Sequence, residues 1–172
     1  LQVDEDTGSS FACNRFYRSR PSTFPQQHTP DFILNSYFCP VIIKQQKQME
    51  IGLTHTSTLT VENKHLAIQA GSGDLEVLAT PVMMALMENA AMLAVKEALD
   101  EGMTTVGGHI SSSHLKPTAL GKTITATAVL TGIEGRKLTF KVVAEDETGT
   151  IGEGEHLRFI VDRKKFMAKL QG

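Results

Sequence analysis

The fold is decided by one stretch of sequence, Thr80-Pro-Val-Met-Met-Ala-Leu-Met-Glu88-Asn-Ala-Ala-Met-Leu-Ala-Val95. It predicts a helix over residues 81–95, because proline is tolerated at the first helical position and threonine is a common N-cap. The only ionisable side chain in the stretch is Glu88. Apolar residues, Met84 and Met92 among them, stand one helical turn away on either side of it. We expect so apolar a helix to be buried, with the other elements packed around it.

The position of Glu88 predicts a functional site. Taking an unpaired carboxylate out of water is costly, so a carboxylate on an apolar face is paired, protonated or part of a site. One structural alternative is open at this point, in which Asn89 or a neighbouring backbone group holds the carboxylate.

Composition restricts the class of protein. The chain has 172 residues, of which 41% are apolar and 21% charged, as expected for one domain with a sizeable core. Its net charge of -2 gives no argument for binding nucleic acid. The longest apolar stretch is shorter than the roughly 20 residues of a membrane-spanning helix. Both cysteines, Cys13 and Cys39, precede Met49, so the rest of the chain has no disulfide framework and no thiolate metal site. These features predict a cytoplasmic protein.

Residues 1–48 differ from the remainder of the chain. They contain four of the six prolines, both cysteines and both tyrosines, and they show no sustained periodicity. We therefore interpret residues 1–48 as an extension, mobile or non-native, and residues 49–172 as the folded domain.

The folded domain is predicted to combine the helix with an antiparallel sheet. Residues 53–61 are rich in threonine and predict a strand, followed by a glycine-bearing loop at residues 71–74. Further strands are predicted at residues 105–114, 122–130, 138–144 and 151–161, with a hairpin loop at 132–137, a turn at 146–150 and a short basic helix at 162–170. One strand, an apolar helix and an antiparallel meander define an α+β fold in which the sheet wraps the helix.

Few other residues suggest chemistry by themselves. His114 ends a predicted strand, where reactive groups are often held, and His109 lies on the opposite face of that strand. No histidine has a partner at metal-ligand spacing, so we expect no metal site. Arg158 lies between Leu157 and Phe159 on the last strand, where a surface arginine is the ordinary interpretation. The glycine-containing pieces lack the pattern of a nucleotide-binding loop.

Several motifs together resemble the hot-dog-fold thioesterases of the fluoroacetyl-CoA thioesterase family. They are the helix from Leu78 to Ala91, the strand from Val106 to His114, Gly121 at the start of the next strand, the segment Ile151-Gly-Glu-Gly-Glu-His-Leu-Arg158 and the tail Lys165-Phe-Met-Ala-Lys169. The resemblance covers about residues 50–172. It implies hydrolysis of an acyl-CoA thioester at a dimer interface, without a cofactor. It also implies that Thr80, Glu88 and His114 are catalytic, and that Gly107 and Arg158 contact the substrate.

The chain departs from this family just before Thr80. The fluoroacetyl-specific enzyme carries phenylalanines there, whereas this chain reads Gly71-Ser-Gly-Asp-Leu-Glu-Val77. We therefore expect a short-chain or aryl acyl group in place of strict fluoroacetyl selectivity. Two alternatives to a thioesterase are an acyl-CoA hydratase or dehydratase on the same fold and a non-catalytic acyl-CoA binding module.

The expected mechanism uses Glu88 as general base or nucleophile, assisted by Thr80, with His114 transferring a proton. A backbone N–H near Gly107 or at the helix start would stabilise the oxyanion. Thr80 and Glu88 stand roughly 12 Å apart along one straight helix. Either Thr80 lies on a loop that folds back, or the site combines Thr80 of one subunit with Glu88 or His114 of the other. We predict an obligate homodimer, or a tetramer.

Overall fold

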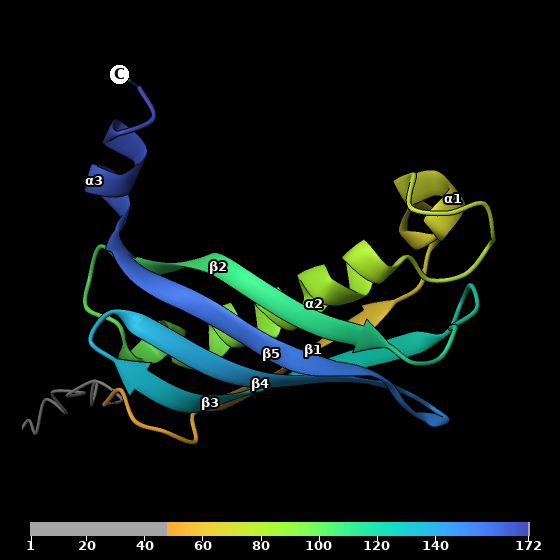
Figure 1. Cartoon of the computed structure of the whole chain (residues 1–172), viewed down its shortest axis with the longest axis horizontal. Helices are drawn as coiled ribbons and strands as arrows, with labels where there is room; N and C mark the ends of the chain where they lie inside the picture. Colours follow the sequence, from red (N-terminus) through yellow and green to blue (C-terminus); the bar gives the residue numbers. More distant parts are fainter. Residues whose placement is uncertain (1–47, 172) are drawn as a thin grey trace, which may run out of the picture. The chain divides into compact units, whose positions relative to one another are not determined.

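The computed structural model describes residues 48–171. The interpretation of residues 1–48 as an extension lies outside the described residues, Gln48 excepted, and stays a prediction. The described part contains a long helix, α2 (Thr80–Val95), and five strands: β1 (Thr54–Thr60), β2 (Met103–His114), β3 (Thr123–Glu134), β4 (Lys137–Asp146) and β5 (Gly149–Asp162) (Figure 1). The shorter elements are η1 (Asn63–His65), α1 (Ala67–Ala70), η2 (Lys96–Ala98) and α3 (Arg163–Ala168).

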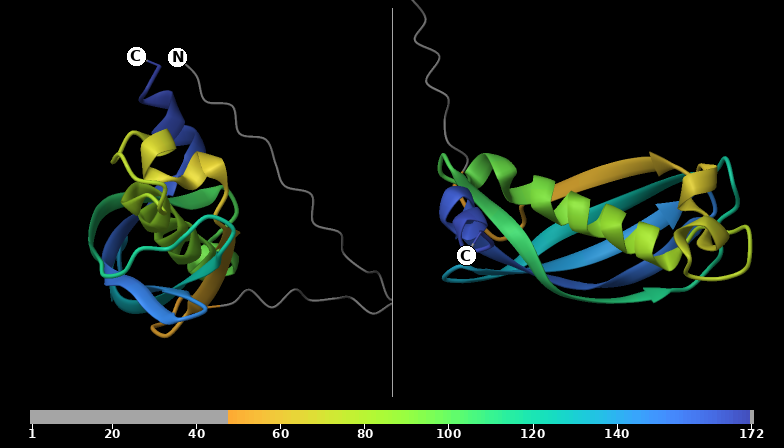
Figure 2. Two further views of the ribbon diagram at one scale, coloured as in Figure 1. Left: turned by 90° about the vertical axis from the view of Figure 1, so that its right-hand side faces the viewer. Right: turned by 90° about the horizontal axis from the view of Figure 1, so that it is seen from above.

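The five strands form one antiparallel sheet with the order β1-β3-β4-β5-β2. Strands β1 and β2 are therefore its two edges. The sheet curves around α2, which runs along its concave face (Figure 2). This arrangement confirms the predicted α+β hot-dog fold.

The core lies between one face of α2 and the sheet. Helix α2 buries residues at helical spacing on this face, namely Met83, Met87, Ala90, Ala91, Ala94 and Val95. Alternate residues of β3 and β4 meet them, as the two-residue period of a half-buried strand requires: Ile124, Ala126, Ala128, Leu130, Leu138, Phe140, Val142 and Ala144. Asn89 is tied to the sheet, because its Oδ1 accepts a hydrogen bond of 2.7 Å from the Ser57 hydroxyl.

At its glycines, the backbone of β5 lies close to α2 and β2. A Cβ on Gly152 would stand 2.6 Å from the sulfur of Met83 and 2.8 Å from the carbonyl oxygen of Ser113. The glycine-containing segment at residues 152–154, which does not fit a nucleotide loop, is therefore explained by close packing of β5 against α2 and β2.

The predicted elements differ from the structure in length and in number. Strands β3 and β4 reach Glu134 and Lys137, so the predicted hairpin loop over residues 132–137 is reduced to a tight turn in which Gly135 has a φ of 60°. The short helices η1 and α1 were not predicted, because each is too short to show a period in the sequence. In the part of the chain described here, no helix has the length and apolar character needed to cross a membrane.

Candidate active site

The first pair of candidate residues meets at the start of α2. Thr80 is the first residue of the helix, and its hydroxyl lies 2.8 Å from Nδ1 of His114 at the end of β2. The prediction that Thr80 caps the helix is wrong. The N-cap is Ala79, and no side chain caps that end. Because the threonine hydroxyl is not engaged by the helix backbone, it is available to His114.

We call Thr80 and His114 the Thr–His pair. It borders a cavity of about 300 Å³ whose other lining residues are Ala67, Ser72, Val77, Leu78, Leu115, Lys116 and Pro117. The Nε2 atom of His114 is buried and has no hydrogen-bond partner among the described residues.

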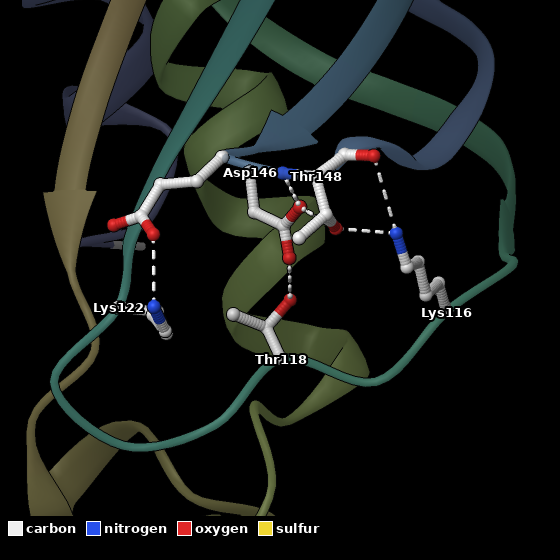
Figure 3. A network of polar contacts seen from close by, with 6 residues as sticks. Lys116, Thr118, Lys122, Asp146 and Thr148 are labelled. Carbon is white, nitrogen blue, oxygen red and sulfur yellow. Dashed lines mark hydrogen bonds and ion pairs between the residues drawn. The ribbon is translucent and has the colours of Figure 1, made fainter.

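The loop that follows β2 is fastened to the turn between β4 and β5 (Figure 3). The Thr118 hydroxyl donates to Asp146 at 3.4 Å, and the backbone N–H of Thr148 donates to the same carboxylate at 2.8 Å. Lys116 donates to Thr148 as well. The Thr118 carbonyl in turn accepts from the N–H of Leu78, two residues before the start of α2. This network therefore connects the two chain segments that carry the Thr–His pair.

Glu88 stands beside buried residues of α2, with Ala91 one turn further along, but it is itself only partly covered. Its side chain is 43% exposed, so the expectation that this apolar helix is buried does not extend to the Glu88 carboxylate. Its carboxylate faces strands β2 and β5, where Gly107 and His156 lie beside it. The structural alternative is contradicted as well, because among the described residues neither Asn89 nor a backbone group forms a hydrogen bond with the Glu88 carboxylate, and Asn89 accepts from Ser57.

Gly107 faces the Glu88 carboxylate from β2. A Cβ on this glycine would stand only 2.7 Å from Glu88 Oε1 and 3.3 Å from a ring carbon of His156. The β2–β5 register shifts between Gly107 and His109, which identifies a β-bulge at this point. Bulges commonly redirect backbone and side chains beside active sites. The absence of a side chain at Gly107 thus keeps the space beside the carboxylate open.

Arg158 is buried, so the interpretation as a surface arginine is wrong. Its side chain is 6% exposed, and Thr105 holds it with two hydrogen bonds of 2.9 Å, one from Nε to the hydroxyl and one from Nη2 to the carbonyl. Nη1 donates to the Glu88 backbone carbonyl at 3.4 Å. The neighbours Leu157 and Phe159 point away from the helix, which reverses the usual orientation of apolar and polar residues on a half-buried strand.

His156 is the residue that sequence reasoning missed. Its side chain is fully buried, and its Nε2 lies 3.6 Å from Glu88 Oε1 and 3.1 Å from Nη1 of Arg158. The available signal was its position two residues before Arg158, since both side chains then lie on the same face of β5. We call Glu88, Gly107, His156 and Arg158 the glutamate cluster.

Burial dominates the electrostatics of this cluster. Burial lowers the pKa of His156, and the Arg158 cation lowers it further. The hydrogen bond to the His109 carbonyl and the charge of Glu88 oppose this shift by raising the pKa. Burial also lowers the pKa of Arg158, and Glu88 opposes this shift. His156 is therefore neutral at pH 7, whereas Arg158, whose ordinary pKa lies far above neutrality, keeps its charge.

The five predicted site residues thus fall into two groups within one chain. The Thr–His pair lies at the N-terminal end of α2, and Gly107 and Arg158 join Glu88 two turns further along. The described residues contain no group of three His, Cys, Asp or Glu side chains arranged to hold a metal ion.

Comparison with known proteins identifies the class. Residues 61–164 match the family model described as fluoroacetyl-CoA-specific thioesterase. The fluoroacetyl-CoA thioesterase of Streptantibioticus cattleyicolor is 40% identical over 96 residues, which is 56% of this chain and 69% of that protein. A crystal structure of the fluoroacetyl-CoA thioesterase superimposes with a TM-score of 0.69 at 32% identity, covering 73% of this chain and 97% of the other. A thioesterase superfamily member from Thermus thermophilus shares the fold at 23% identity, with a TM-score of 0.67 over 73% of this chain and 93% of its own.

The fold and the arrangement of site residues accordingly define a protein of the hot-dog-fold thioesterase class. Within that class, the chain belongs to the fluoroacetyl-CoA-specific thioesterase family.

Proposed function

We propose that the protein hydrolyses a short-chain or aryl acyl-CoA thioester to the free acid and CoA. The observation that carries this proposal is the state of the Glu88 carboxylate. It is partly exposed beside Gly107, and its distance of 3.6 Å from His156 is too long for a hydrogen bond. No described side chain donates a hydrogen bond to it, so both oxygens are available to act on a substrate.

The chemistry requires attack on the thioester carbonyl carbon and departure of the CoA sulfur. Either Glu88 attacks directly, giving an acyl anhydride that water then hydrolyses, or Glu88 removes a proton from the attacking water. In both routes the C–S bond breaks, and the thiolate takes a proton from His114. The oxyanion can be stabilised by a backbone N–H near Gly107 or at the start of α2.

The separation of the two groups supports a site shared by two subunits. Thr80 and Glu88 are eight residues apart, which corresponds to roughly 12 Å along the helix. One thioester carbonyl cannot contact both side chains at that distance. We therefore propose an obligate homodimer in which the glutamate cluster of one subunit faces the Thr–His pair of the partner subunit.

Strand β2 offers a surface for such a dimer. It is an edge strand, so one row of its backbone groups is not paired within the sheet. Gly107 lies in its first half, and His114 is its last residue. Antiparallel pairing of two β2 strands about a two-fold axis between Ile110 and Ser111 would place Gly107 opposite His114 of the partner subunit. The same pairing would continue the sheet from one subunit into the next.

A second cavity supports an acyl group larger than fluoroacetyl. It has a volume of about 350 Å³ and is lined by Met92, Leu93, Lys96, Leu99, Asp100, Glu101, Met103, Thr104, Thr105 and Arg163. Met92 follows Glu88 by four residues and so lies on the same helix face, one turn further on. An acyl chain attached to a carbonyl at Glu88 can extend along α2 into this cavity. Four of its lining residues are apolar and can contact an aliphatic or aromatic group, and four others are charged.

The test is release of free thiol from acetyl-, propionyl- and benzoyl-CoA. We expect turnover by the wild type and a loss of at least about 10²-fold in Glu88→Gln, the scale of a positioned acid–base group. Glu97→Gln is the matched control, because Glu97 is an exposed residue near the other end of the helix. Near wild-type activity of Glu88→Gln would contradict the assigned role. Inactivity of the wild type on all three substrates, together with saturable binding of them, would favour a non-catalytic binding module.

The shared site is tested by complementation. Inactive Thr80→Ala and Glu88→Gln proteins are mixed under conditions in which subunits exchange, and heterodimers that carry one intact site should recover activity. Continued inactivity despite demonstrated exchange would contradict the shared site, as would a monomeric active enzyme in sedimentation. His114→Ala should also be inactive, and intact-protein mass spectrometry after adding substrate should show a trapped acyl group only if Glu88 or Thr80 is the nucleophile.

The proposal includes a cytoplasmic location, supported by the absence of cysteine from residues 49–172. Cell fractionation with detection of the tagged chain tests it, and recovery in a secreted fraction would contradict it.

A further inference from the structure

His156 is a fully buried polar side chain of the glutamate cluster, and the mechanism above does not use it. Its surroundings come from three elements: Glu88 on α2, His109 on β2 and Arg158 on β5. Each of its ring nitrogens has one close partner. Because the ring is fully buried, these contacts decide where its proton lies.

The tautomer follows from the chemistry of the two partners. Nδ1 lies 2.7 Å from the carbonyl oxygen of His109, which can only accept, so Nδ1 carries the proton and donates it. Nε2 lies 3.1 Å from Nη1 of Arg158, which can only donate, so Nε2 is the acceptor. Both bonds can exist together only in the neutral ring with its proton on Nδ1.

This tautomer has a consequence for Glu88. The Nε2 lone pair is directed to Arg158, so His156 has no proton to give to Glu88 Oε1 at 3.6 Å. A doubly protonated ring would instead carry an N–H on Nε2 and could form an ion pair with Glu88. That ion pair would engage the carboxylate that must act on the thioester. Burial and the Arg158 cation both oppose this second protonation.

The other bond of His156 acts on the bulge of β2. The His109 carbonyl that it holds belongs to the first residue after the register shift, directly beyond Gly107 and Gly108. Gly108 is covered on its other side by the ring of Phe159, which a Cβ at that position would overlap. The bulge is thus held from both faces of the sheet, and His156 supplies the only described side-chain hydrogen bond to it.

We propose that His156 is a positioning residue of the active site, which holds the β2 bulge and Arg158 in place and, as the Nδ1–H tautomer, leaves the Glu88 carboxylate free to react. This inference rests on the proposed thioesterase function. The positioning role belongs to the hydrogen bonds of both ring nitrogens, and a substitution can remove each bond separately.

The first test reads the tautomer without reference to activity. In ¹⁵N-histidine-labelled protein, long-range ¹H–¹⁵N correlation spectra should show one slowly exchanging ring with a protonated Nδ1 and an unprotonated Nε2 at pH 7, and this ring should be absent from His156→Asn. The same pattern should persist in Glu88→Gln, because the carboxylate is not a partner of the ring. An Nε2–H tautomer or a doubly protonated ring at pH 7 would overturn the proposal, even if the protein is an active thioesterase.

The second test separates the two bonds. In His156→Asn, the amide nitrogen can replace Nδ1 as donor to His109, but no atom replaces Nε2. In His156→Gln, the amide oxygen can replace Nε2 as acceptor from Arg158, but no atom replaces Nδ1. On a wild type that is active, both variants should lose kcat by about 10-fold or more with KM changed much less, because substrate binding does not involve His156. If folded His156→Asn keeps the wild-type kcat, the bond to Arg158 has no positioning role. If folded His156→Gln keeps it, the bond to the His109 carbonyl has none.

If both variants fail to fold, the labelled wild type still decides the question. Titration between pH 5 and pH 8 should then show that kcat falls wherever His156 becomes doubly protonated. Full activity with a doubly protonated His156 would overturn the proposal.

Discussion

The substitution Gly107→Ala tests the geometry of the glutamate cluster most directly. The added methyl group would stand 2.7 Å from Glu88 Oε1, whereas ordinary contacts begin at 3.4 Å, so the carboxylate must retreat by about 0.7 Å. The methyl group would also press on the His156 ring at 3.3 Å, but it would remain 3.8 Å from Arg158. The φ of Gly107 is not in the left-handed region, so the backbone itself accepts alanine.

The two expected effects of Gly107→Ala differ in size. The Glu88 side chain is flexible and 43% exposed, so moving its end should change the melting temperature by less than about 4 °C. Catalysis depends much more steeply on position, since a displacement of about 1 Å can cost about 10²-fold in rate. We therefore expect kcat/KM to fall by about 10- to 100-fold while the fold is retained.

The measurement is thiol release from the best of the three acyl-CoA substrates, paired with thermal unfolding. Gly132→Ala is a matched control, because Gly132 also adjoins a register shift in the sheet but its Cβ would meet only Thr139, at 3.4 Å. The control should keep wild-type activity. If Gly107→Ala keeps kcat/KM within about threefold of the wild type, the carboxylate next to Gly107 is not the reacting group and the mechanism is wrong.

Three further predictions concern the acyl cavity, the network around Asp146 and the N-terminal residues. Met92→Trp should fill the cavity and lower kcat/KM for benzoyl-CoA by about 10-fold more than for acetyl-CoA. The volume-conserving Met92→Leu should affect both substrates alike. Equal losses on both substrates in Met92→Trp would place the acyl group elsewhere. Hydrogen bonds from Thr148 lower the pKa of Asp146, so its contribution to stability is present above the ordinary carboxyl pKa and is lost as the pH falls through the lowered value. Asp146→Asn should therefore lower the melting temperature by about 3 °C at pH 7 and have no effect near pH 2, and an equal deficit at both pH values would contradict the role of the ionised carboxylate. A chain that begins at Met49 should keep the activity and melting temperature of the full chain, as the composition of residues 1–48 predicts, and a large fall in either would show that those residues contribute to the fold.

The sequence by itself determined the central helix and the class of fold. The helix could be read because its signals are local: Pro81 at its start, no further proline or glycine up to Val95, and a single charge in an apolar stretch. The strands were recognised from alternation and turn residues, although their ends were misplaced by a few residues where the chain stays extended into tight turns. The anomaly of Glu88 was also visible in the sequence, because a lone carboxylate on an apolar helix requires an explanation.

Only the tertiary structure decided how the site residues are grouped. Thr80 has the sequence of a helix cap, yet its hydroxyl bonds His114, a residue that the sheet brings to the start of the helix from 34 positions away. His156 and Arg158 lie on an apolar strand, and their burial depends on which face of β5 turns toward α2. A bulge at Gly107 and Gly108 shifts the pairing of β2 with β5 by one residue, and such a shift exchanges the two faces of β2 beyond it. The sequence reveals which residues are unusual, but contacts between distant segments depend on register and curvature, which belong to the folded sheet as a whole.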